Sequence, residues 1–108
     1  MGKVDVVNQI GDVLTQTDMI LSDPDLSQSS PEWQQLFALR KHLDDQQREL
    51  VQEILVDNTN QFANLATQLS ASADSLEEVA DDINKIGSVL QTVASVSSLV
   101  DKILSLAT

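Results

Sequence analysis

Hydrophobic residues recur at spacings of three and four along three stretches of the chain, which is the period of one face of an α-helix. The first stretch covers residues 3–22, and polar residues fill the positions between its apolar ones. Its repeating positions are Val7, Ile10, Leu14, Thr17 and Leu21. This pattern predicts an amphipathic helix over residues 3–22, in which Gly11 marks a close contact with another helix.

Residues 22–31 interrupt the pattern and contain both prolines of the chain together with several Ser and Asp residues. Such residues hydrogen-bond their own backbone or fix its φ angle, so we expect a loop. At its end Ser30 precedes Pro31 and Glu32, which is typical of a helix start. The Ser hydroxyl can cap free amides, and Pro suits the first helical position. A second helix is therefore predicted to begin at residue 31.

The remaining apolar rows predict a long helical hairpin with arms over residues 31–70 and 75–106. Four residues of low helix propensity, at positions 57–60, predict a kink or break in the first arm. The turn is placed at 70–75, because Asp74 with Glu77 fits a capping box. The alternative is a helix that continues through this segment, since the apolar row keeps one heptad register across it.

The second half of the third predicted helix carries an apolar stripe that is wider than a two-stranded seam. The stripe consists of Val89, Leu90, Val93, Val96, Val100, Ile103 and Leu104. A first helix of about 20 residues cannot cover hairpin arms of about 35–40 residues, so we expect an exposed stripe, and exposed stripes mark association. The fold prediction is all-α: one domain over residues 1–108, a coiled-coil-like three-helix bundle completed by oligomerisation, most simply as a dimer.

Charge and composition narrow the classes of partner. The net charge is −11 and there are six Lys and Arg residues, so nucleic acid and anionic membranes, which need clustered basic residues, are disfavoured. The chain has no cysteine, no apolar signal core near its start and no apolar run of the roughly 20 residues that a membrane span needs. We expect a cytoplasmic protein, with export by a route that uses no signal peptide left open.

No pattern of residues predicts catalysis, a cofactor or a metal site. His42 is the single histidine and lies among charged residues, so we expect it on the surface. Glu49, Glu53 and Asp57 are four apart and could bind a hard cation. Calcium sites are usually compact loops rich in Asp and Gly, however, so a solvated helix face is the favoured interpretation. The chain is predicted not to be an enzyme.

Trp33 follows the predicted helix start at residue 31 and has two interpretations. It could anchor a protein interface, where Trp often contributes much of the binding energy. It could instead pack beneath the 22–31 loop as a hydrophobic staple, and we favour the staple. Trp33 and the residues of the apolar stripe are the candidate interaction residues.

Residues 75–86, Ser-Leu-Glu-Glu-Val-Ala-Asp-Asp-Ile-Asn-Lys-Ile, resemble stretches in the long helices of bacterial chemoreceptor signalling domains. The glutamate-rich hairpin tip of those receptors has no counterpart here, and no function follows from the resemblance. In size, acidity and helical pattern the chain is similar to small bacterial secretion chaperones and secreted helical-hairpin proteins. The Trp-x-Gly turn of one such secreted family is absent, because Trp33 is followed by Gln34 and Gln35.

Three functions remain open from the sequence. The first is a non-catalytic interaction or assembly protein that self-associates or binds a helical partner through the apolar stripe. The second is a protein whose C-terminal stripe lies on a lipid surface, although the stripe has few flanking Lys, Arg or Trp residues. The third is a carrier of a small ligand or metal inside the bundle. We favour the first.

Overall fold

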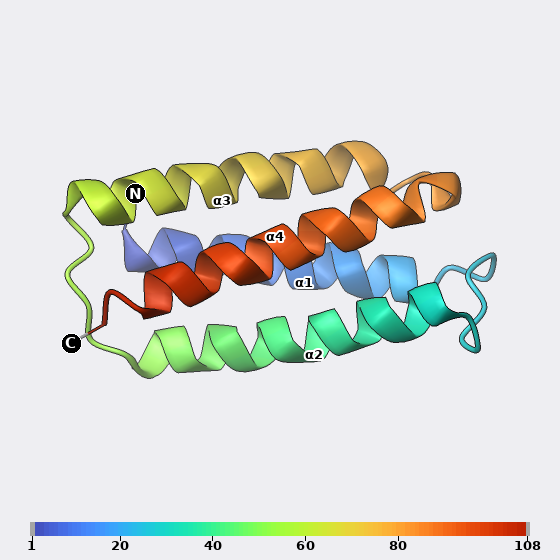
Figure 1. Ribbon diagram of the computed structural model, residues 1–108, viewed down its shortest axis with the longest axis horizontal. Helices are drawn as coiled ribbons and strands as arrows, with labels where there is room; N and C mark the ends of the chain where they lie inside the picture. The colour runs from blue at the N-terminus through green and yellow to red at the C-terminus, as the bar shows by residue number, and fades with distance from the viewer. Residues whose placement is uncertain (1, 108) are drawn as a thin grey trace.

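The computed structural model describes residues 2–107, and its regular structure is helical, which confirms the all-α prediction (Figure 1). There are four α-helices and one short 3-10 helix, η1, among these residues. They are α1 (Lys3–Leu21), α2 (Pro31–Gln52), α3 (Asn60–Val79), η1 (Ile83–Lys85) and α4 (Ile86–Leu104).

The four helices pack side by side as an elongated bundle of 42 × 23 × 16 Å. α1 and α4 each pack against both α2 and α3, so α2 and α3 lie on opposite sides of the bundle. α1–α2 and α3–α4 are antiparallel hairpins. The segment 53–59 joins them by running across one end of the bundle, at the left of Figure 1. Successive helices alternate in direction, which is the up-down-up-down arrangement of four-helix bundles.

The predicted three-helix arrangement is wrong, because the second predicted helix, 31–70, is two helices. α2 ends at Gln52, and residues 53–59 have no regular structure, with extended backbone angles at Glu53 and Thr59. The Thr59 side chain accepts the backbone N–H of Phe62 at 3.1 Å and so caps α3. The kink predicted near 57–60 therefore falls within a complete break. The weak helix formers and the Thr59 cap fix where α3 begins, but they lie too far along the chain to explain why α2 ends at Gln52.

The hairpin turn predicted at 70–75 is also wrong. α3 continues through this segment, where the Ser75 hydroxyl donates to the carbonyl of Ala71 at 3.0 Å. The chain reverses between Val79 and Ile86 instead, and the Asp82 carboxylate accepts the N–H of Asn84 at 2.9 Å. The continuous apolar register outweighs the capping-box pattern, because packing of a helix face contributes more than one cap.

One core runs the length of the bundle and draws on all four α-helices. Its fully buried side chains include Val6, Ile10, Leu36, Leu43, Leu50, Phe62, Leu69, Leu76, Val93 and Val100. Each such side chain contributes about 1.5–3 kcal/mol relative to an exposed one. Gly11 faces α2, and a Cβ at this position would lie 3.4 Å from Nε2 of Gln47. This is an ordinary van der Waals distance to the end of a flexible side chain, so the close helix contact predicted at Gly11 is not shown.

Candidate interaction surface

The apolar stripe predicted to be exposed on the last helix lies inside the bundle. Its members Val89, Val93, Val96, Val100 and Ile103 are at most 1% exposed, and Leu90 and Leu104 are half-buried against the core. The expected exposure is wrong because the break after α2 creates an additional helix, and α2 and α3 together cover α4. The geometric reason for a dimer through this stripe is thereby removed.

Trp33 links the end of α1 to the start of α2. Its indole Nε1–H donates to the carbonyl of Leu21 at 2.9 Å, and its ring stacks on Phe37 with centroids 5.1 Å apart. The ring is half-buried against the core. The side chain therefore packs beneath the loop between the two helices, as the staple interpretation predicts, while Phe37 remains 42% exposed.

Exposed apolar side chains gather at the end of the bundle where the first turn of α1 meets the end of α2. Val4 is 71% exposed, Val51 56%, Ile54 79% and Val56 57%. We call these four residues the apolar end surface. A shallow hollow of about 240 Å³ adjoins two of them, Val4 and Val51, and is also lined by Lys3 and Val7.

The segment 53–59 is held against α1 by hydrogen bonds from Lys3. The Lys3 ammonium donates to the carbonyls of Val51 at 3.0 Å and Glu53 at 2.7 Å. The Lys3 backbone N–H donates to the Asp57 carboxylate at 2.7 Å. This carboxylate therefore satisfies a free amide at the positive end of the α1 dipole, although it lies 54 residues away in the chain.

Side chains in this segment alternate between the bundle and solvent, as expected for extended backbone. Leu55 is half-buried and packs on the core, whereas Ile54 and Val56 on either side of it are exposed. The same geometry that buries Leu55 thus imposes the exposure of its neighbours. Sequence reasoning missed this surface because it placed residues 51–56 inside a helix. No local signal in the sequence ends the helix at Gln52, so the sequence alone could not locate this surface.

Carboxylates outnumber cationic side chains on the two segments that form the apolar end surface, residues 3–5 and 48–57. Glu49 is exposed and Glu53 half-buried, and neither carboxylate forms an ion pair with another residue of the range 2–107. The Lys3 ammonium donates hydrogen bonds to the carbonyls of Val51 and Glu53. The Arg48 guanidinium pairs with Asp44 at 3.1 Å. This end of the molecule therefore presents apolar side chains with excess negative charge.

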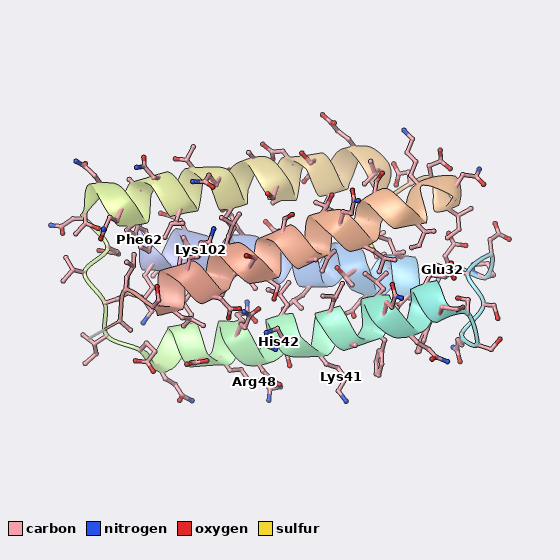
Figure 2. The ribbon with its side chains drawn as sticks, viewed as in Figure 1. Glu32, Lys41, His42, Arg48, Phe62 and Lys102 are labelled. Carbon is pink, nitrogen blue, oxygen red and sulfur yellow. The ribbon has the colours of Figure 1, made fainter. Side chains whose placement is uncertain are left out.

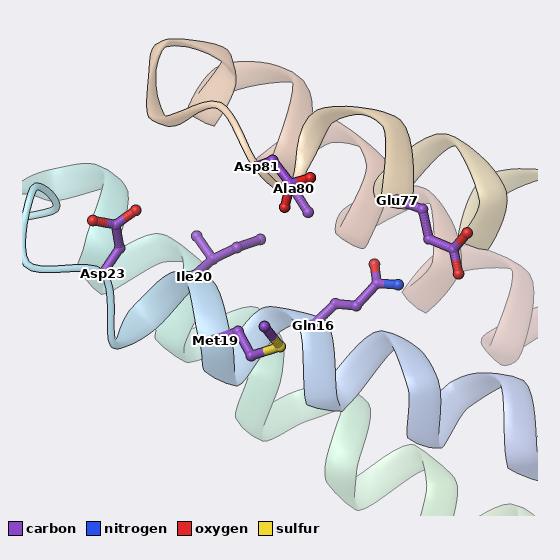
Figure 3. A pocket seen from close by; sticks show the side chains of 7 residues that line it. All are labelled: Gln16, Met19, Ile20, Asp23, Glu77, Ala80 and Asp81. Atoms are coloured by element: carbon purple, nitrogen blue, oxygen red, sulfur yellow. The ribbon is translucent and has the colours of Figure 1, made fainter.

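A second hollow, of about 410 Å³, lies between the ends of α1 and α3 at the opposite end of the bundle (Figure 3). Gln16 extends from α1 toward α3, and Met19, which is 69% exposed, lies beside it. The other lining residues are Ile20, Asp23, Glu77, Ala80 and Asp81. Its titratable side chains are the three carboxylates of Asp23, Glu77 and Asp81, and no histidine, hydroxyl or basic side chain is among the lining residues.

The charged residues of α2 lie on its outer side. Lys41 and Arg48 project away from the bundle in Figure 2, and His42 is exposed, as expected from its charged neighbours. Nε–H of Arg40 donates to Asp18 on α1 at 2.9 Å, and this hydrogen bond raises the pKa of Arg40 above its usual value. Within residues 2–107, no three His, Cys, Asp or Glu side chains come together as a metal site, Glu49, Glu53 and Asp57 included.

Comparison with protein-family models, with curated proteins and with solved structures returned no match. Among the helices between residues 2 and 107, none is both long and apolar enough to cross a bilayer. The function is therefore inferred from the surfaces described above.

Proposed function

We propose that this protein is a non-catalytic interaction protein that binds another polypeptide through the apolar end surface. The observation that carries the proposal is the exposure of Val4, Val51 and Ile54 at one end of the bundle, each more than half exposed, with Val4 and Val51 lining one hollow. Scattered apolar residues are normal on protein surfaces, whereas contiguous ones mark interaction sites.

The closed core supports this function. Helix packing already buries the apolar rows of all four helices within one copy, so the exposed side chains are not needed to complete the fold. Their cost in solubility is offset by the high net charge of −11. An interface that contributes binding energy through a few anchored apolar side chains fits such a surface.

A photo-crosslinking side chain at position 54 tests the proposal. The variant is expressed in the source cells, and its adducts are identified by mass spectrometry. We expect one polypeptide to be captured from position 54 and again from position 51. The matched control is position 19, because Met19 is similarly exposed at the other end of the bundle.

The captured polypeptide is then purified and its binding measured directly. Val51→Asp should abolish binding, and Met19→Asp should leave it unchanged. Adducts that are no more abundant from positions 51 and 54 than from position 19 would contradict the proposal. Capture of a second copy of the chain would identify the interaction as self-association, the form expected from the sequence.

A further inference from the structure

We infer that the partner presents an extended, positively charged segment with apolar side chains, which pairs along residues 53–57. This inference rests on the proposed function and specifies the partner's chemistry. Two independent features carry it: the charge around the apolar end surface, and the free backbone of the segment that crosses it.

The negative charge around the apolar end surface favours a basic partner. Asp5, Glu49, Glu53 and Asp57 lie on the segments that form or flank it, and the Lys3 ammonium is already bonded to two carbonyls. Complementary charge speeds association and excludes partners of like sign. A second copy of this chain is disfavoured for the same reason, because each copy carries a net charge of −11.

The backbone of residues 53–57 favours a partner in extended conformation. Within the described range 2–107, the N–H and C=O groups of Ile54, Leu55 and Val56 form no hydrogen bond to protein atoms. The segment begins extended at Glu53 (φ −76°, ψ 145°), and its side chains alternate between half-buried and exposed from Glu53 to Asp57, as they do along a strand. Unpaired groups on extended backbone are the feature to which another strand adds.

In the proposed complex the two features act together. Backbone hydrogen bonds to residues 54–56 align the partner, and its alternate apolar side chains extend the row formed by Ile54 and Val56. Lys or Arg side chains on the partner then reach Glu49 and Glu53, whose carboxylates are otherwise unpaired with residues of the described range. The interaction requires no change in the bundle.

The probe for the test is a fluorescein-labelled twelve-residue peptide of alternating Val and Lys, and binding is followed by anisotropy. We expect saturable binding that weakens about tenfold or more between low and high salt. The matched peptide of alternating Val and Glu should not bind. A basic peptide of equal charge with a Leu–Lys pattern of helical period should bind less tightly than the Val–Lys peptide.

Variants of the protein separate the two features. Glu49→Gln with Glu53→Gln should weaken binding about fivefold or more, and Ile54→Ser with Val56→Ser by about tenfold. The matched controls are Glu77→Gln with Glu78→Gln, which removes the same charge from α3, and Met19→Ser. Both controls should bind as the parent does, and circular dichroism verifies that every variant is folded.

Several outcomes would overturn the inference. These are no binding of the Val–Lys peptide, equal binding of the Val–Glu peptide, insensitivity to the Glu49 and Glu53 substitutions, or tighter binding of the helical peptide. Concentration-dependent dimerisation that Ile54→Ser with Val56→Ser abolishes would show that a second copy is the occupant. If the peptide fails while position 54 still captures a polypeptide, the proposed function stands and the inference about the partner falls.

Discussion

Gln46 on α2 and Ser97 on α4 form a reciprocal pair of hydrogen bonds inside the bundle, although 51 residues separate them. The Gln46 amide donates to the Ser97 carbonyl at 3.0 Å, and the Ser97 hydroxyl donates to Gln46 Oε1 at 2.9 Å. The same amide also donates to Asp101 at 2.6 Å. Because both residues are buried, the pair favours one register of α2 against α4.

This pair should show strong coupling in a double-mutant cycle. Gln46→Leu and Ser97→Ala alone should each lower the free energy of unfolding by about 1–2 kcal/mol, because each leaves a buried polar group unpaired. The double variant should cost less than the sum by about 1 kcal/mol, since neither partner is then left unsatisfied. Urea denaturation followed by circular dichroism measures all four proteins. Additive effects would show that the two side chains do not depend on each other.

Valines of the core and of the apolar end surface should respond differently to truncation. Val93→Ala should lower the free energy of unfolding by about 2 kcal/mol, because it leaves a cavity at a fully buried position. Val51→Ala should change it by less than about 0.5 kcal/mol, since that side chain is 56% exposed. The comparison uses the same chemical change at both sites. A larger loss at Val51 than at Val93 would contradict the burial described here.

The hydrogen bond of Trp33 can be tested separately from its packing. Trp33→Phe keeps an aromatic ring near Phe37 but removes the donor to the Leu21 carbonyl, so we expect a loss of about 1 kcal/mol. Trp33→Ala should cost more, because the stacking and the contact with the core are also lost. Trp33 is the single tryptophan, so both variants lack tryptophan fluorescence and unfolding is followed by circular dichroism instead. Equal stability of the Phe variant and the parent would show that the hydrogen bond contributes nothing.

The contact between Asp57 and the start of α1 should stabilise the crossover segment. Asp57→Ala removes the acceptor of the Lys3 backbone N–H, and we expect a loss of about 1 kcal/mol, comparable to that of a helix cap. Asp57→Asn retains an oxygen acceptor and should cost less. Asp45→Ala, at an exposed position of α2, provides a control expected to stay within about 0.5 kcal/mol. If Asp45→Ala proved the more destabilising, the capping role of Asp57 would be excluded.

Local signals in the sequence predicted the first half of the fold well. The helix expected over 3–22 is α1, and the expected cap at Ser30 is present, with its side chain accepting the Trp33 N–H at 3.1 Å. Both depend on interactions within a few residues, which a sequence shows directly. The weak segment at 57–60 was also recognised, because low helix propensity is a local property.

The extent of the break and the place of the last turn depend on tertiary contacts. Nothing local ends α2 at Gln52: the segment after it is extended because Leu55 packs on the core and Asp57 binds α1. Likewise, residues 70–75 are helical because Leu69 and Leu76 are both fully buried. The apolar end surface follows from the first of these contacts, so it could not be located before the fold was known.

The crossover segment 53–59 has a consequence for how the chain folds. It divides the chain into two hairpins. Contacts within one hairpin close short loops of the chain, whereas contacts between the two hairpins, such as Gln9 with Ser70, close loops of some sixty residues. We expect the hairpins to form early and to dock late, since long-range contacts slow folding. Until docking is complete, the apolar face of each hairpin is exposed and can pack against a hairpin of another chain. Refolding at high protein concentration is therefore the condition under which such misassembly competes with the native bundle.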